Sequence, residues 1–438
     1  MAETIAEPAR DTEVLGDYDV VVAGGGPAGT CAGLAAARAG CRTLLVEQLG
    51  CLGGMATAGL HQKIAVYFGS GGSPEIVGGL PKEIADRAVV EAQSDYRPDG
   101  LFVEPEGLKL LLDCMAEESG LQLLYYTHAC SPLVEEGHVR GLFLHSKSGR
   151  QLARARCLVD CSGDADVAFR AGVPCMQGRD EDGRMQPCTL MFRLGGVAWD
   201  DVRRYLGTDP GLETFCRTAH ERGLMGPWQS RLMGFWRIPS RPDQVGVNFT
   251  HMHLDATSAA DLTRGCIEGR RQVHQAVRAM RRLIPGFEHA VLLDTAPYVG
   301  IRETRRIRGE YILTAEDIQA QRIFDDSIGL GAAFIDIHNV EGPGMDRRSG
   351  YHLPPGGYYA IPYRTLVPQG VEGLLVAGRC HSATHEAAGS TRWMTQCMVM
   401  GQAAGTASAL SIEAGTPPRA LPAEALRRRL LRDGAILA

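Results

Sequence analysis

The chain has 438 residues, among them 54 glycines and 13 cysteines, and carries a formal net charge of −6 at pH 7. This length buries a sizeable core in two or three lobes, and the glycine content favours an α/β protein with many tight turns. The acidic balance gives no electrostatic reason to expect a nucleic-acid partner. Because we find neither a signal peptide nor an apolar run that could span a bilayer, we expect a cytoplasmic protein without a membrane partner.

Residues 1–16 are polar and acidic, and we expect a disordered tail there. Residues 17–47 then read as a strand, a glycine turn, a helix of small residues and a second strand. Gly24, Gly26 and Gly29 have G-x-G-x-x-G spacing, which permits the turn, the approach of a pyrophosphate and close packing of helix on sheet. The first helical turn, which includes Pro27 and Ala28, directs N–H groups at the phosphates. All five residues are therefore assigned to a dinucleotide site.

Two further features follow this unit. Glu47 ends the second strand, where an acid accepts hydrogen bonds from a ribose hydroxyl, and Gln48 follows it. The pair Gly53 and Gly54, with Thr57 after it, is a second place where backbone can lie against a ligand, although an ordinary glycine-rich loop would look the same.

The next part of the chain returns to the nucleotide site. We expect a helix over 106–120 and strands over 121–126, 139–145 and 151–159. The last strand delivers Ser162, Gly163 and Asp164 to a turn, and a short helix follows over 165–171. We find one complete G-x-G-x-x-G pattern, which implies one dinucleotide and no separate nicotinamide domain.

Domain boundaries follow from changes in residue composition along the sequence. Residues 17–179 form the first part of a nucleotide-binding domain, 180–290 a substrate or cap domain, 291–416 the return segment and 417–438 a C-terminal helix. In the cap, His251 and His253 are two residues apart, so on a strand both side chains face the same side. They form either a polar strand face or a pair of metal ligands. A basic helix over 258–283 is read as a solvated face.

The return segment supplies several charged groups. Arg302, Arg305 and Arg306 surround an extended stretch, and Thr314 caps a helix. A buried apolar run ends at Gly378 and Arg379, after which Ser390 or Thr391 caps a long helix. The cysteines are scattered, include no C-x-x-C pair and are read as buried apolar residues, which leaves open one redox-active thiol.

The motifs GGGPAG, LGGMATAG, DCSGDADVAFRAGVP, RETRRIRGEY, IPYR and LLVAGRCHSATHEAAGSTRWM, together with Glu47, resemble the FAD-dependent oxidoreductases of the glutathione-reductase-like superfamily. The nearest resemblance is to a broad family related to the fumarate reductase and succinate dehydrogenase flavoproteins. It implies an α/β fold with a discontinuous Rossmann-like FAD-binding domain and an inserted α+β substrate domain. The complete His/Arg substrate clamp of the fumarate reductases is not found.

The resemblance also implies residue roles around FAD. The glycine turn holds the pyrophosphate, and Glu47 the adenosine ribose. Ala129 flanks the adenine, and Gly163 and Asp164 lie along the ribityl-phosphate side. Gly378 and Arg379 follow the ribityl chain, while the helix from Thr391 faces the pyrimidine edge. Some relatives attach FAD covalently through histidine, and His61 lies near that region.

Catalytic candidates follow from flavin chemistry, in which N5 takes a hydride and charge grows at N1 and O2. Arg392 is the candidate that stabilises this negative charge. His385, with His381 and Glu386 nearby, is the candidate that accepts the proton. His381 and His385 are four residues apart, which could also suit zinc, but no metal is expected. Arg302 is an anion clamp or, like its neighbours, part of a structural ion pair.

We therefore predict an FAD-dependent oxidoreductase of the dehydrogenase or oxidase type. It acts on a small organic molecule, anionic if Arg302 is a clamp, by hydride transfer to or from flavin N5. Its electron partner is dioxygen or a redox protein. A tRNA-modifying flavoprotein and a non-catalytic flavin-binding subunit are the alternatives, and a homo-oligomer is left open.

Overall fold

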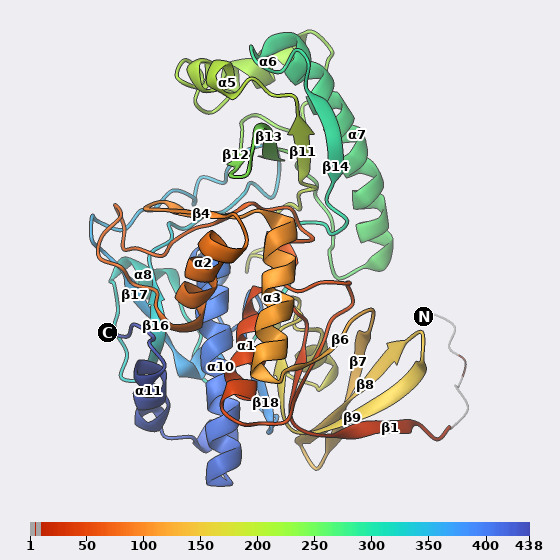
Figure 1. Ribbon diagram of the computed structural model, residues 1–438, viewed down its shortest axis with the longest axis vertical. Coiled ribbons are helices and arrows are strands. Elements are labelled where there is room, and N and C mark those ends of the chain that lie inside the picture. Colours follow the sequence, from red (N-terminus) through yellow and green to blue (C-terminus); the bar gives the residue numbers. More distant parts are fainter. Residues whose placement is uncertain (1–4, 6–9) are drawn as a thin grey trace.

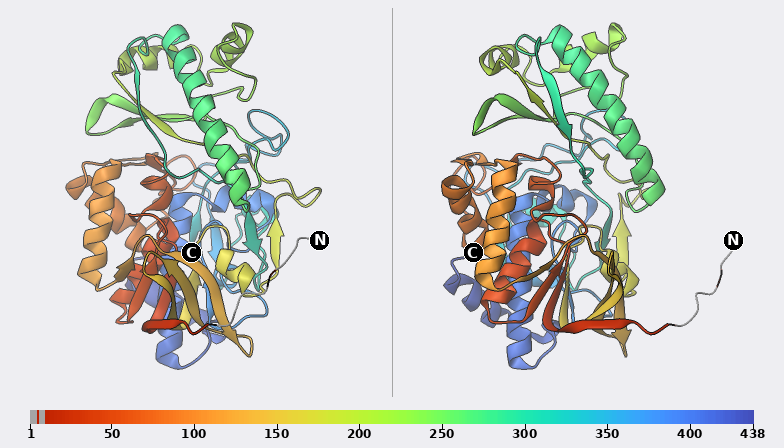
Figure 2. Two further views of the ribbon diagram at one scale, coloured as in Figure 1. Left: turned by 90° about the vertical axis from the view of Figure 1, so that its right-hand side faces the viewer. Right: turned by 45° about the vertical axis from the view of Figure 1, so that its right-hand side comes forward.

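The computed structural model describes residue 5 and residues 10–438, and in it two lobes lie along the long axis of the molecule (Figure 1). The α/β lobe holds both ends of the described chain. The cap lobe, drawn in green, contains residues from the middle of the sequence and covers one end of the α/β lobe (Figure 2). No helix among the described residues is long and apolar enough to cross a membrane.

A seven-stranded sheet lies at the centre of the α/β lobe, in the order β6-β2-β1-β9-β8-β7 with β18 beside β9. Strands β6, β2, β1, β9 and β18 pair in parallel, whereas β7 and β8 are antiparallel. The strands are β1 (Glu13–Ala23), β2 (Thr43–Val46), β6 (Gln122–Leu124), β7 (His128–Glu135), β8 (His138–Ser146), β9 (Gly149–Asp160) and β18 (Leu374–Val376).

The carboxyl-terminal ends of the parallel strands, such as residues 20–23 of β1, are buried apolar runs because helices pack on the sheet. These and the remaining helices of the lobe are α1 (Pro27–Arg38), α2 (Gly79–Glu91), α3 (Pro105–Ser119), α4 (Asp166–Arg170), α8 (Ala315–Gln319), α9 (His385–Thr391), α10 (Met394–Ala414) and α11 (Ala423–Arg432). Its smaller sheets use β3 (Lys63–Ile64), β4 (Asp95–Arg97), β5 (Gly100–Phe102), β10 (Cys175–Gln177), β15 (Arg305–Ile307), β16 (Ser327–Gly331) and β17 (Tyr359–Pro362).

Helices α1 and α10 pack side by side in the middle of this lobe (Figure 1). A Cβ on Gly401 would lie 2.0 Å from the carbonyl oxygen of Ala28, and one on Gly405 would lie 2.2 Å from that of Ala32. Glycine at these two positions therefore lets the helix backbones touch. The contact places the N-termini of both helices at the same side of the sheet.

The cap lobe is built on an antiparallel sheet in the order β12-β13-β11-β14. Its elements are α5 (Trp199–Leu206), α6 (Glu213–Glu221), α7 (Ala259–Leu283), β11 (Phe192–Gly195), β12 (Gly234–Ile238), β13 (Arg241–Asn248) and β14 (Val291–Thr295). The core of the lobe is a cluster separate from that of the α/β lobe and includes Phe192, Phe215, Phe249 and Phe287.

The predicted fold class, a discontinuous Rossmann-like α/β lobe with an inserted α+β lobe, is confirmed. Two boundaries differ from the predicted ones. Strand β1 begins at Glu13, so the predicted tail 1–16 is wrong for residues 13–16, while residues 1–4 and 6–9 lie outside the described residues. Strand β14 pairs with β11, so residues 291–295 belong to the cap sheet and not to the return segment.

Candidate functional site

The parallel strands end in register at one edge of the sheet. Ala23 pairs with Val46 on one side and with Asp160 on the other, and Asp160 pairs with Val376. The loops after these strands therefore start side by side, and ligands of open α/β sheets bind at this carboxyl edge.

The glycine turn after β1 leaves room for a ligand. Gly24 has a φ of +100°, and a Cβ on Gly29 would lie 1.7 Å from the carbonyl oxygen of Gly24, so both positions require glycine. A Cβ on Gly26 would meet no atom within 4 Å. Helix α1 begins there with no side-chain cap and no acid in its first turn, so its N–H groups face an open, positive site.

Glu47 reaches into this turn from the end of β2. The backbone N–H of Gly25 donates to its Oε2 over 2.6 Å, and that of Leu49 donates to its Oε1 over 2.8 Å. Burial raises the pKa of the carboxyl group above its usual value, although these hydrogen bonds oppose the shift. Each carboxylate oxygen keeps a further acceptor site for a ligand hydroxyl.

A cavity of about 610 Å³ runs from this turn towards the cap lobe. Most of the residues predicted for the site line it: Gly24, Gly26, Pro27, Ala28, Glu47, Gln48, Gly54, Ala129, Ser162, Gly163, Asp164, Arg302, Gly378, Arg379 and Arg392. Five do not: Gly29, Gly53, Thr57, His385 and Thr391.

Gly53 and Thr57 support the cavity wall from behind. The N–H of Gly53 donates to the carbonyl of Gly25 over 2.8 Å. The hydroxyl of Thr57 donates to the carbonyl of Leu52 over 2.5 Å. A Cβ on Gly54 would lie 2.9 Å from the Cα of Gly26, so this loop touches the glycine turn.

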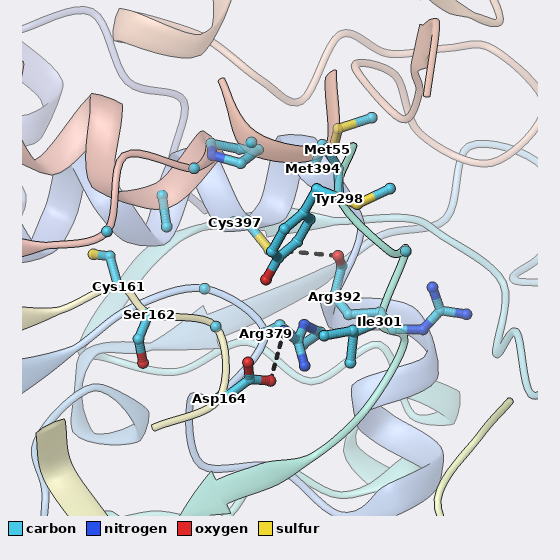
Figure 3. A pocket seen from close by; sticks show the side chains of 18 of the residues that line it. Met55, Cys161, Ser162, Asp164, Tyr298, Ile301, Arg379, Arg392, Met394 and Cys397 are labelled. Carbon is cyan, nitrogen blue, oxygen red and sulfur yellow. Dashed lines mark hydrogen bonds and ion pairs between the residues drawn. The ribbon is translucent and has the colours of Figure 1, made fainter. Parts of the chain in front are cut away.

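Asp164 and Arg379 form an ion pair of 2.8 Å on the cavity wall, with Tyr298 and Ile301 in the same cavity (Figure 3). Thr304 joins them, because its hydroxyl donates to Asp164 over 2.5 Å and accepts from Arg379 over 3.2 Å. Two loops that follow different strands are thereby fixed to each other.

The far end of the cavity carries two guanidinium groups, Arg302, which is buried, and Arg392, which is partly buried. Arg392 pairs with Asp336 at 2.7 Å. Arg302 donates to the carbonyl of Pro187 over 2.7 Å and has no carboxylate within 4.0 Å among residues 10–438. Burial lowers the pKa of Arg302 to about 10, with a contribution from Arg392, so the side chain remains charged at neutral pH.

The other two arginines of this stretch have structural partners. Arg305 pairs with Asp166 at 3.0 Å, and its guanidinium lies over the ring of Phe169. Arg306 is buried and pairs with Glu303. Of the three, only Arg302 lines the cavity.

His385 does not line the cavity, so the structure does not support its prediction as the group that transfers the proton. Its ring is buried, and Nδ1 bonds to Oε1 of Glu303 at 2.8 Å, beside Arg306. The polar stretch 381–386 looks reactive in sequence, but both of its histidines are buried, and Glu386 is partly exposed and pairs with Arg348 at 3.2 Å. His381 is likewise buried, with Nε2 bonded to the hydroxyl of Thr391 at 2.7 Å.

The start of the last long helix also differs from the prediction. Helix α9 ends at Thr391, and α10 begins after Trp393, which is its N-cap. Trp393, Met394 and Cys397 line the cavity, whereas the buried Thr391 does not. Helix α10 has no side-chain cap and no acid in its first turn, so its positive end faces the cavity.

Sequence reasoning missed the histidine that does line this end, His338, and its neighbour Asp336. The only available signal was their spacing of two residues in an extended stretch, which places both side chains on one face. His61 lines the cavity as well and packs on Trp236, with ring centroids 4.5 Å apart. His251 and His253 lie outside the lining, and the described residues contain no group of three or more His, Cys, Asp or Glu that could hold a metal ion.

Comparisons with known proteins identify the family of the chain. A family model described as FAD dependent oxidoreductase matches residues 19–430. Digeranylgeranylglycerophospholipid reductase 1 of Methanopyrus kandleri is 31% identical over 209 residues, 42% of this chain and 54% of that protein. The digeranylgeranylglycerophospholipid reductase of Methanoculleus marisnigri is 29% identical over 173 residues, 36% of this chain and 42% of that protein.

The chain thus spans about half the length of the curated relatives it matches. A crystal structure of a geranylgeranyl bacteriochlorophyll reductase-like protein from Thermoplasma acidophilum aligns with a TM-score of 0.46 and 15% identity. The alignment covers 97% of this chain and 86% of that chain.

Proposed function

The chain belongs to the FAD-dependent oxidoreductase family, and from this premise we propose that it oxidises a small anionic organic molecule by hydride transfer to N5 of the flavin. FAD is the cofactor, and it supplies the acceptor for two electrons. Dioxygen or a redox protein then removes these electrons.

Residues along the cavity suit the parts of FAD in order. The open position beside Gly26 and the uncapped start of α1 would hold the pyrophosphate. Glu47 would hold the adenosine ribose, and Ala129 would flank the adenine. The pair of Asp164 and Arg379 would lie along the ribityl side.

The far end of the cavity would then face the reactive ring. Arg392 and the positive end of α10 would stabilise negative charge that grows at N1 and O2. Arg392 is oriented for this by Asp336, whose side chain and carbonyl both accept from it, over 2.7 and 3.1 Å.

One observation carries the choice of substrate, namely that Arg302 has no direct ion pair among the described residues. The residue is 7% exposed, and its hydrogen-bond partner is a neutral carbonyl. Asp336 attracts its charge but is itself bonded to Arg392, and a buried charge without a directly bonded counter-ion is costly. A substrate carboxylate would supply a direct counter-ion and would accept two parallel hydrogen bonds from the planar fork.

Anaerobic mixing of the FAD-loaded protein with small carboxylates and with their neutral amides tests this function. We expect at least one carboxylate to bleach the flavin absorbance, while the matching amide does not. Equal bleaching by both members of every reactive pair, or no bleaching by any compound, would reject an anionic substrate.

Glu47 gives a separate test of the cofactor site. Glu47→Ala should weaken FAD binding by about 1.5–3 kcal/mol, the scale of a lost hydrogen bond to a charged group. Fluorescence titration of the apoprotein with FAD measures the change. Glu83→Ala, which removes an exposed carboxylate paired with Arg38, is the control and should bind FAD as the wild type does. Equal affinity of the Glu47 variant and the wild type would remove Glu47 from the site.

We also expect neither NADH nor NADPH to reduce the flavin rapidly, because the sequence holds a single complete dinucleotide motif. Stopped-flow absorbance with each nucleotide under anaerobic conditions measures this. Flavin reduction faster than with the best carboxylate would show that a nicotinamide binds productively without a second nucleotide fold.

A further inference from the structure

Among the described residues, His338 is the histidine of the cavity lining that lies within ion-pair distance of a carboxylate. Its Nε2 lies 3.5 Å from Oδ1 of Asp336, and its Nδ1 is buried without a hydrogen-bond partner among the described residues. Its backbone is fixed, since the N–H donates to the side chain of Gln186 over 3.1 Å and a β-bridge links it to Met345. The ring is thus held at the cavity wall with one nitrogen unused.

Asp336 determines which nitrogen of His338 is free. The pKa of Asp336 is low because His338, Arg392 and Arg302 outweigh the effect of its burial, so the carboxylate is ionised. An ionised carboxylate beside Nε2 favours a proton on that atom and leaves the lone pair on Nδ1. Asp336 is itself held by Arg392 at 2.7 Å.

The surroundings of His338 keep its ring neutral. The charged and titratable groups that face it are Arg302, Asp336, Arg392 and His251. Burial and the charge of Arg302 lower its pKa to about 4, against the opposing effect of Asp336. The imidazole is therefore neutral at pH 7, and the lone pair on its Nδ1 is free to accept a proton.

His61 and His251 lack this combination, and His128 lines the adenine end of the cavity with Ala129. His61 also has a buried, unpartnered Nδ1, but its ring packs on Trp236 and has no carboxylate partner in residues 10–438. His251 uses Nε2 for the carbonyl of Gly342 at 2.9 Å, and it does not line the cavity.

We propose that His338 is the catalytic base of this enzyme, with Asp336 as its positioning residue, and that the substrate is a 2-hydroxy- or 2-aminocarboxylate. The proposal rests on the proposed function, because it needs the substrate carboxylate on Arg302. Arg302 and His338 line the same cavity, and the charge of Arg302 lowers the pKa of His338. A small molecule in this cavity that carries a carboxylate for Arg302 and a proton-bearing oxygen or nitrogen for His338 has the two groups that the proposal needs.

The step balances without a further reagent. The substrate C–H bond breaks and its hydride goes to FAD, while the O–H or N–H proton goes to Nδ1 of His338. A C=O or C=N bond forms, so the substrate loses two electrons and FAD gains them.

Lactate, malate, alanine and aspartate, each as both enantiomers, are the probes. The FAD-loaded protein is mixed with each under anaerobic conditions, and the fastest probe is used for all variants. His338→Gln should slow flavin reduction about 10²–10⁴-fold, the usual size of a general-base contribution. Asp336→Asn should lower the rate at saturation, while the half-saturating probe concentration, which Arg302 sets, stays unchanged.

Chemical rescue separates a catalytic role of His338 from a structural one. Added imidazole should restore part of the rate in His338→Ala, because the freed space admits a replacement base. His251→Gln, the matched control, should reduce at the wild-type rate. An unchanged rate in His338→Gln, or the absence of rescue in His338→Ala, overturns the role of His338.

The failure of this inference differs from a failure of the proposed function. If none of these probes bleaches the wild type while another carboxylate does, the substrate class is wrong and the anionic substrate stands. If the amides bleach as well as their acids, the proposed function itself is wrong.

Discussion

Replacement of Arg302 by methionine should lower kcat/KM for the carboxylate substrate on the order of 10²–10³-fold, because the loss of one partner from a buried charge pair costs about 2–5 kcal/mol. Arg302→Lys should already be harmful, since a point charge cannot reproduce two parallel hydrogen bonds. FAD should remain bound in both variants, because Arg302 lies at the opposite end of the cavity from the glycine turn. Steady-state kinetics per bound FAD measure the effect.

Arg193→Met is the matched control for this change. Arg193 is a half-buried arginine of the cap sheet that pairs with Asp294 at 2.9 Å, and it does not line the cavity. It should keep the wild-type kcat/KM. Loss of FAD from the Arg302 variants would indicate a structural role, and unchanged kinetics would remove Arg302 from the substrate site.

Glu303→Ala should lower the free energy of unfolding by about 3–5 kcal/mol, the scale for breaking a buried ion pair from one side. Both side chains of the Glu303–Arg306 pair are 1% exposed. Glu303 also bonds to His385 at 2.8 Å and accepts from the backbone of Gln186 over 3.1 Å. Its removal would leave a buried guanidinium without a counter-ion.

Urea denaturation of FAD-saturated protein measures this loss. Asp200→Asn is the control, because its pair with Arg203 is highly exposed and worth about 0–1 kcal/mol. Although burial opposes it, His385 and Arg306 lower the pKa of Glu303. Its contribution is therefore present at neutral pH and is lost as the pH falls through the lowered folded-state pKa. A Glu303 variant as stable as the control would show that the network is not stabilising.

The nucleotide half of the site could be predicted from sequence because its signals are local. The spacing of Gly24, Gly26 and Gly29 and the acid at Glu47 lie within one strand-turn-helix-strand unit. Parallel pairing then brings other strand ends to the same edge, so Asp164 and Arg379 also line the cavity as expected. Close packing of Gly29 on Gly24 shows the physical reason for the motif.

The reactive end could not be predicted because long-range packing decides it. His385 begins α9 and is buried with its ring bonded to Glu303, whereas His338 lies in an irregular stretch and beside Asp336 at the cavity. The break between α9 and α10 moves the helix start from Thr391 to Trp393, which the run of small residues conceals. Residues 291–295 belong to the cap lobe and not to the predicted return segment, because they pair with β11, which is far away in sequence.

Titration of the bound flavin with oxalate tests most directly whether an anion subsite lies against the flavin. Oxalate carries the carboxylate of the proposed substrates and has no C–H bond to oxidise, so the absorbance change reports binding alone. We predict a saturable shift of the visible flavin band in the wild type. Arg302→Met should raise the half-saturating concentration on the order of tenfold or more, which corresponds to about 1.4 kcal/mol. An absent shift in the wild type, or equal half-saturation in both proteins, would contradict an anionic substrate held by Arg302.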